Sequence, residues 1–362
     1  SMFENGWQNG NDNTSGTNSS LLIEGGTFSG GLNTIKNDDY GELTINGGTF
    51  TNMAQAAFLN WNVATVNGGT FEAKEGSNAI ILNGYGNATM DKGELTINGG
   101  SFNTEKTSVN FIKTMYTKKD FTSGTIEVNG GNIYGDIQLS DVTEGATLSI
   151  ANGVTINGNI TNGGVANVDV TNATVTGSVS NAGTGSVVIS DGATVEGAVS
   201  NTGSGSMAVI ESKVGGYSPE QTITFVDSTT TNGETIKNTQ DVSAACARID
   251  AKYYDTLKEA LTESISGDTI TLVKDVTVSN TQDMANSNYN EAVITLKDGV
   301  TLDGDTHTIY ASESWVKSTD GNNIDKPANH IVGVSGVSAT IKNLTIVGNE
   351  NTKHGINAFG TN

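Results

Sequence analysis

Aromatic side chains recur just after the second expected strand of each early repeat, and a cluster of lysines lies beside the last of them. Exposed aromatic faces beside polar groups suit sugar rings, and lysines among them favour carboxylated or sulfated glycans. Alternatively, these aromatics only shield strand ends and corner hydrophobic residues. The residues predicted to contact a ligand are Trp7, Tyr40, Trp61, Tyr85, Tyr116, Lys113, Lys118 and Lys119.

A short repeat positions these residues. The motif at 45–50, an aliphatic residue followed by Asn-Gly-Gly-Thr-Phe, returns in variants at 23–28, 66–71, 97–102 and 128–133. Looser copies are anchored on Ile150, Val170, Ile189 and Ile210. Neighbouring copies lie 19 to 22 residues apart, apart from two spacings of 31. A period near 20 residues with tolerated insertions is typical of a solenoid.

Each repeat combines alternating β-branched residues with Asn-Gly-Gly, which permits the positive φ angles of a sharp corner. About two or three strands fit into such a unit, too few to enclose a core, so the repeats must stack. We therefore predict an all-β, right-handed parallel β-helix in which equivalent residues form columns. The expected columns are Phe28, Phe50, Phe71 and Phe102, and Asn46, Asn67, Asn98 and Asn129.

The pattern divides the chain into three parts. Residues 1–217 are predicted to form a first β-helix, beginning with the end of an earlier coil at 3–7. Residues 218–247 have few apolar anchors and are expected to be a closing turn and connector. Residues 248–362 are expected to start a second β-helix module whose last coil is cut short.

A short amphipathic helix near 256–266 is predicted to cap this second module. Thr256 and Glu259 have the spacing of a capping box, and Gly267 supplies a stop. Leu257, Ala260, Leu261 and Ile265 should share one face of the helix, which would cover strand edges and the open core.

Composition narrows the possible partners. The formal net charge of −21 makes nucleic acid and anionic membranes poor partners. No apolar run reaches membrane-spanning length, so membrane insertion is not expected. Cys246 is the single cysteine and cannot form an internal disulfide. We expect a piece of a longer secreted protein with flanking domains.

The motifs resemble a known architecture. The Asn-Gly-Gly-Thr-Phe repeats, together with the stretch from Ala247 to Leu272, resemble right-handed parallel β-helix proteins of the pectate-lyase-like fold. More narrowly, they resemble large repeat-containing surface proteins of gut-type bacteria. The resemblance implies an extracellular location on the bacterial cell surface. It says little about activity, because this solenoid hosts lyases, hydrolases, tailspikes and adhesins.

The sequence lacks a clear set of the catalytic residues that lyases and hydrolases of this fold use. Arg248 lies away from the repeats, Asp38 and Asp39 are interpreted as solvated turn carboxylates, and His307 and His330 as ordinary surface or corner residues. Asp303 and Asp305 offer at most weak Ca²⁺ binding, because the spacing of a calcium loop is missing. No other cofactor is expected.

These observations favour a non-enzymatic adhesin-like or stalk module that presents a long face to glycans or host surface polymers. A polysaccharide lyase or glycosidase acting on acidic polysaccharide is the alternative. A passive spacer is the third possibility.

Overall fold

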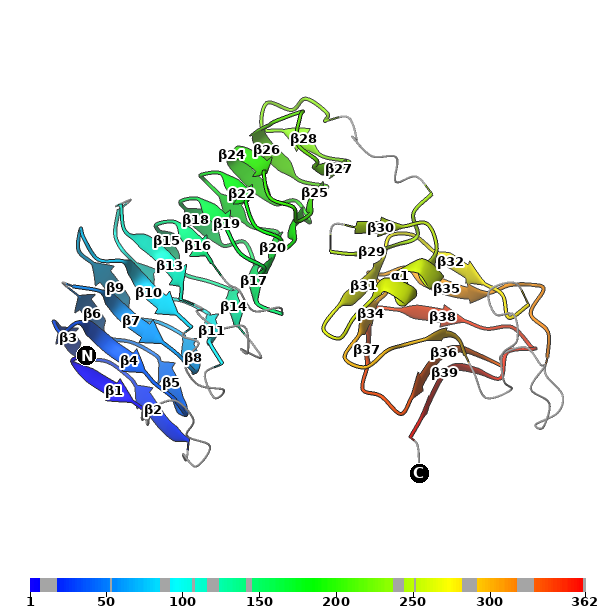
Figure 1. The fold of residues 1–362 in the computed structure, drawn as a ribbon, viewed down its shortest axis with the longest axis horizontal. Helices are drawn as coiled ribbons and strands as arrows, with labels where there is room; N and C mark the ends of the chain where they lie inside the picture. Colours follow the sequence, from blue (N-terminus) through cyan, green and yellow to red (C-terminus); the bar gives the residue numbers. More distant parts are fainter. Residues whose placement is uncertain are drawn as a thin grey trace. The chain divides into compact units, whose positions relative to one another are not determined.

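A computed structural model describes residues 1–6, 18–52, 54–84, 92–105, 108–115, 124–140, 145–236, 244–250, 252–281, 292–317 and 329–360. The chain forms two compact units, Ser1–Gln240 and Asp241–Asn362. Both are built from stacked coils of parallel strands, as predicted (Figure 1). Among the described residues, the single helix lies in the second unit.

In the first unit most coils contribute three strands, and each strand pairs in parallel with its counterpart in the next coil. The first column contains β2 (Ser19–Ile23), β5 (Gly41–Ile45), β8 (Val63–Val66), β11 (Glu94–Ile97), β14 (Thr125–Val128), β17 (Thr147–Ile150), β20 (Asn167–Thr171), β23 (Val187–Ser190), β25 (Met207–Ile210) and β27 (Thr224–Val226). The second contains β3 (Thr27–Ser29), β6 (Thr49–Asn52), β9 (Thr70–Ala73), β12 (Ser101–Phe102), β15 (Asn132–Tyr134), β18 (Thr155–Asn157), β21 (Thr174–Val175), β24 (Thr194–Asn201), β26 (Lys213–Tyr217) and β28 (Thr229–Thr230). The third contains β1 (Phe3–Asn5), β4 (Asn33–Asn37), β7 (Ala56–Asn60), β10 (Ala79–Asn83), β13 (Asn110–Thr114), β16 (Ile137–Leu139), β19 (Ile160–Asn162) and β22 (Val179–Asn181), and it joins the second at β24.

The predicted phenylalanine column is confirmed. Phe28, Phe50, Phe71 and Phe102 occupy paired positions, and their rings stack at centroid distances of 5.2, 4.8 and 5.0 Å. The column continues with smaller side chains, because Phe102 pairs with Ile133, the next coil has Ile156 there, and later coils place valine. Aromatic stacking and burial of these rings therefore stabilise the early coils most.

The predicted asparagine column is also confirmed, on the exposed side of the corner. Each amide donates to the oxygen of the preceding coil, from Asn67 to Asn46 (2.9 Å), Asn98 to Asn67 (2.9 Å) and Asn129 to Asn98 (3.3 Å). The adjoining glycines allow this close stacking. A Cβ on Gly68 would lie only 2.5 Å from the Asn46 carbonyl oxygen, and Gly69 has a φ of +106°.

A second asparagine ladder, inside the solenoid, was not predicted. Its amides donate in the opposite sense, from Asn5 to Asn37 (2.9 Å), Asn37 to Asn60 (2.9 Å) and Asn60 to Asn83 (2.7 Å). The same NH₂ groups also reach corner carbonyls, such as that of Glu94 from Asn60 (3.0 Å). Because these side chains are buried, the ladder satisfies backbone groups that no water could reach.

The first unit extends beyond the predicted boundary at residue 217. Strands β27 and β28 pair in parallel with β25 and β26, which places a further coil inside the segment expected to be a connector. Phe225 and Ile236 belong to the core of this unit. The repeat pattern is hard to recognise in this segment, because threonine and serine occupy several positions that are aliphatic in the earlier coils.

The second unit repeats the architecture with three coils. An antiparallel pair, β29 (Ala247–Ile249) and β30 (Lys252–Tyr254), precedes helix α1 (Leu257–Glu263), and β29 also pairs antiparallel with β31. The parallel columns are β31 (Thr269–Leu272), β34 (Thr301–Asp303) and β37 (Thr340–Lys342); β32 (Val276–Val278), β35 (Thr308–Ala311) and β38 (Thr345–Val347); and β33 (Ala292–Thr295), β36 (His330–Ser335) and β39 (His354–Phe359).

Helix α1 begins with the predicted capping box. Thr256 Oγ1 accepts from the Glu259 N–H (3.2 Å), and the Glu259 carboxylate accepts from the Thr256 N–H (3.1 Å). Leu257 and Ala260 are buried, and the helix contacts β29, β30 and β33. The helix ends at Glu263, so Ile265 lies outside it and is exposed, contrary to the prediction.

The interpretation of His330 as a surface or corner residue was wrong. Its side chain is 1% exposed and stacks on His354 of the next coil, with ring centroids 4.8 Å apart. Nδ1 of His330 has no hydrogen-bond partner among the described residues. Burial first, and then His354 and Lys353, lower the pKa of His330 to about 4.

We expect Asn60→Ala to lower the free energy of unfolding of the first unit by about 3 kcal/mol, because it orphans several buried polar groups. Asn67→Ala, on the exposed ladder, should cost about 0.5 kcal/mol. Hydrogen exchange of the β7 and β10 amides measures both. Equal losses in the two variants would contradict a special role for the inner ladder.

We also expect the second unit to lose stability in mild acid. The pKa of His330 in the folded chain lies below its ordinary value of 6.5, so the unfolded chain binds the additional proton. The free energy of unfolding of the second unit is therefore highest, as far as His330 is concerned, above pH 6.5. It decreases by about 3 kcal/mol as the pH falls toward 4. His330→Phe should remove this component in hydrogen exchange of β36 and β39. An unchanged pH profile in that variant would exclude His330 as its source.

Candidate ligand-binding surface

Only part of the predicted ligand site falls within the described residues. Trp7, Tyr85, Tyr116, Lys118 and Lys119 lie outside them. The structure does place three of the predicted residues, namely Tyr40, Trp61 and Lys113, and all belong to coils of the first unit that contain β4, β7 or β13.

The expectation that the aromatics present open faces does not hold for Tyr40 and Trp61, which are 6% and 8% exposed. The ammonium group of Lys36 lies 3.9 Å from the centroid of the Trp61 ring, so a cation already covers one face. Tyr40 has a φ of +59° in the turn that leads into β5. Both side chains therefore pack in the corner, and a sugar could not stack on either without rearrangement.

Asp38 and Asp39 are buried, which corrects their interpretation as solvated turn carboxylates. The Asp38 side chain is fully inaccessible, and its Oδ2 lies 2.5 Å from Nζ of Lys36. Its Oδ1 accepts from the Asp39 N–H at 2.9 Å. Glu4 Oε1 lies 3.6 Å from the same ammonium. Lys36 therefore compensates a buried carboxylate that would otherwise be strongly unfavourable.

The carboxyl groups of Glu4 and Asp38 lie beside the same ammonium group, that of Lys36. Hydrogen bonding with Asp38, with burial as the next cause, raises the pKa of Glu4 above its usual value. The ion pairs with Lys36, at 3.6 and 2.5 Å, assign both carboxyl groups a structural role in this corner.

Lys36 and Lys113 flank two leucines in one outward row. Successive coils pair Lys36 with Leu59, Leu59 with Leu82, and Leu82 with Lys113. The two leucines between the lysines are buried. They belong to a small cluster outside the main core, here called the apolar patch: Ala56, Leu59, Trp61, Ala79 and Leu82.

Beyond Lys113 the same row becomes polar and accessible. Lys113 pairs with the exposed Gln138, and the row continues through Thr161, Ser180 and Ser200, all half-buried. Two neighbouring outward rows are polar as well. Together these residues form a surface here called the polar face: Gln138, Thr161, Ser180, Ser200, Asp136, Asn159, Ser178, Tyr134, Asn157 and Thr176.

Hydrogen bonds between coils hold several side chains of the polar face in place. Asp136 Oδ1 accepts from the backbone N–H (2.7 Å) and the amide (3.1 Å) of Asn159. Asn159 Oδ1 in turn accepts from the Ser178 N–H (2.9 Å). Such a surface offers fixed amide, hydroxyl and carboxylate groups at the spacing of neighbouring strands, about 4.8 Å. It can exchange hydrogen bonds with a polyhydroxylated polymer without large ordering costs.

Tyr134 is an aromatic residue of this face that was not among the predicted ligand contacts. It ends strand β15, points outward between the buried Ile133 and Gly135, and is half-buried. Asn132-Ile133-Tyr134 replaces the Thr-Phe pair of earlier repeats, and this departure was the available signal. Tyr134 gives the polar face one accessible ring in the coil that also contains Gln138.

Asp303 and Arg248, the other polar residues considered for a site, make hydrogen bonds or ion pairs within the second unit. Asp303 Oδ1 accepts from the Asp305 N–H and the Asn343 amide, and Oδ2 lies 3.0 Å from Lys342 Nζ. Arg248 donates to the Asp250 carbonyl. Within the described ranges, no group of three or more His, Cys, Asp or Glu side chains is placed to hold a metal ion. The described helix is not long and apolar enough to cross a membrane.

No family model matches the sequence, and a comparison with curated proteins finds no match. Among solved structures, the chain is similar to the tapirin C-terminal domain of Caldicellulosiruptor kristjanssonii, with 12% identity over 95% of this chain and 91% of that chain. The TM-score is 0.16, which does not demonstrate a shared fold. The solenoid assignment therefore rests on the strand pairing described above.

Removing Lys36 should reveal its structural role. We expect Lys36→Met to destabilise the early coils by about 3 kcal/mol, because Asp38 would remain buried without its cation. The double variant with Asp38→Asn should recover most of that loss. Lys113→Met, which uncovers no buried carboxylate, serves as the control. Hydrogen exchange of β1 and β4 is the measurement, and a loss below about 1 kcal/mol would contradict the assignment.

Proposed function

We propose that this chain is a non-enzymatic module of a bacterial surface protein whose first unit binds a carboxylated or sulfated glycan along the polar face. The observation that supports this most is the position of Lys113 and Tyr134 at one end of that face. A cation and an accessible ring there adjoin an array of amide and hydroxyl groups held in register by the coils.

The chemistry of the face fits a polymer better than a small molecule. The rows run over four successive coils, a length of about 15 Å at the usual strand spacing. Sugar hydroxyls can pair with Gln138, Thr161 and Ser180, and an apolar sugar face can lie on Tyr134. Lys113 would attract acidic sugar groups locally, although the chain as a whole carries a net charge of −21.

The extracellular location belongs to the same proposal and rests on the resemblance of the repeats to bacterial surface proteins. A solenoid suits such a setting, because it presents a long face without requiring a large globular core. Flanking domains of a longer protein would then determine how the module is anchored.

Two substitutions test the binding face. We expect Tyr134→Ala and Lys113→Met each to weaken binding to heparin or polygalacturonate about fivefold, by surface plasmon resonance. Only the effect of Lys113→Met should shrink at high salt. Matched controls are Tyr310→Ala, an exposed tyrosine of the second unit, and Lys74→Met, an exposed lysine of the first.

Failure of the wild-type chain to bind any acidic glycan, or equal losses in the controls, would overturn the proposal. If incubation of the chain with these glycans yields unsaturated or new reducing-end products, the polysaccharide lyase or glycosidase alternative applies instead.

A further inference from the structure

A pocket of about 260 Å³ lies beside helix α1 in the second unit. Its apolar walls come from the helix and from two strands of the first coil, β32 and β33. These wall residues are Leu257, Leu261, Val276, Val278, Val293 and Ile294. The thiol-bearing residue Cys246, just before β29, completes the lining. Leu257, Val278, Ile294 and Cys246 are each less than a tenth exposed, so these walls are parts of the core.

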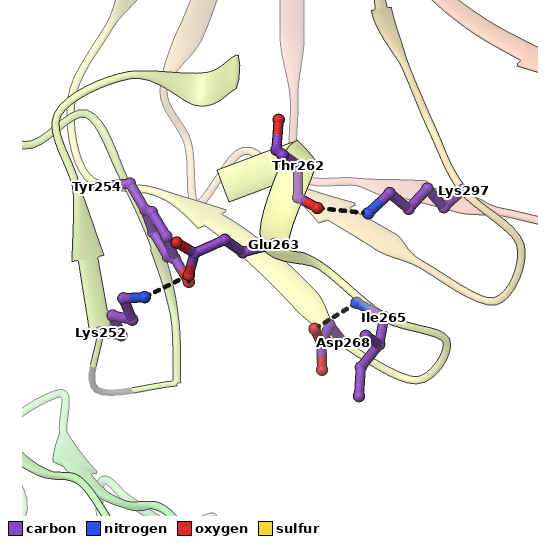
Figure 2. Close-up of polar contacts among 7 residues, drawn as sticks. All are labelled: Lys252, Tyr254, Thr262, Glu263, Ile265, Asp268 and Lys297. Atoms are coloured by element: carbon purple, nitrogen blue, oxygen red, sulfur yellow. Dashed lines mark hydrogen bonds and ion pairs between the residues drawn. The ribbon is translucent and has the colours of Figure 1, made fainter. Parts of the chain in front are cut away.

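Several contacts hold the C-terminal end of α1 in place. Lys252 pairs with Glu263, and Tyr254 Oη donates to the same carboxylate at 3.1 Å. The Lys297 ammonium donates to the Thr262 carbonyl at 2.7 Å, and the Ile265 N–H donates to Asp268 at 2.8 Å (Figure 2). These contacts fix the last turn and the residues that follow it, so the pocket is preformed.

The rim of the pocket carries both signs of charge. Lys274 and Asp275 are already engaged, by the Ala244 carbonyl (2.6 Å) and by the Thr308 N–H (2.8 Å) respectively. Asp255 and Lys258, three residues apart where α1 begins, are exposed. A ligand that combines an apolar body with one ammonium and one carboxylate group complements this arrangement.

We propose that this pocket binds a free α-amino acid with an apolar side chain. The volume is below the 300–1,000 Å³ typical of sites for drug-sized ligands, which matches a single large amino acid. The side chain enters between Leu261 and Val276. The ammonium group faces Asp255 and the carboxylate faces Lys258, where solvent moderates but does not remove their attraction.

Calorimetry on the full chain with four probes tests this ligand class. L-Phenylalanine should bind with a Kd of about 1 mM or tighter. 3-Phenylpropanoate and 2-phenylethylamine, which each lack one charge, should bind about fivefold more weakly, and L-serine should not bind. If phenylalanine shows no saturable binding, or if serine matches it, the proposal is wrong.

Two variants locate the binding. Leu261→Trp should fill the pocket and abolish phenylalanine binding. Because this change could disturb folding, Lys258→Met provides a milder test on an exposed side chain. It should weaken phenylalanine binding about fivefold and leave 2-phenylethylamine binding unchanged. Lys317→Met, at an exposed lysine of the second unit that does not line the pocket, is the control and should not alter either affinity. Equal effects of the two lysine variants would place the ligand elsewhere.

The single cysteine offers an independent readout. Burial raises the pKa of the Cys246 thiol, so its alkylation by iodoacetamide should be slow, and bound phenylalanine should slow it further. At saturating phenylalanine we expect at least a threefold decrease in rate, measured by intact mass. No protection in the presence of saturable binding would exclude this pocket as the site.

Discussion

Coil-to-coil hydrogen bonding in register is the constraint on which the rest of this structure depends. Each coil has too few apolar residues to form a core alone, and it becomes stable only when its backbone pairs with the coil before and after it. Once register is set, identical residues must meet. Phenylalanines at equivalent positions then stack their rings, and asparagines at equivalent positions form hydrogen bonds between their amides. Like charges in the same columns would repel each other.

Register also explains which features the sequence could predict. The columns of Phe50 and Asn67, the parallel fold and the capping box of Thr256 depend on spacing alone, and spacing is visible in the sequence. The inner ladder of Asn37 and Asn60 was equally periodic. Its burial was not predicted, because an asparagine that ends a short strand is typical of an exposed turn.

Depth of burial was harder to predict than register. Trp61 and Asp38 follow their strands where exposed corner residues are expected, yet each is buried against Lys36. A tryptophan and an aspartate at adjacent corners give no indication that one lysine will serve both. The accessible ring is instead that of Tyr134, in a coil where Asn-Ile-Tyr replaces the Thr-Phe pair of the earlier repeats. Side-chain exposure depends on the loops around a corner, and their course is not encoded in the period.

The inner asparagine ladder is interrupted once. Opposite Asn83 the next coil has Thr114, and the one after has the buried Leu139, before amides resume at Asn162 and Asn181. The cooperative polarisation of linked amides cannot cross such a gap. The inner ladder is thus divided into two segments at the coil where the outward-facing residues also change from apolar to polar, although backbone pairing and the hydrophobic core continue through that coil. Under mechanical load, local opening should therefore begin at this coil, which lacks the amide links present on either side of it.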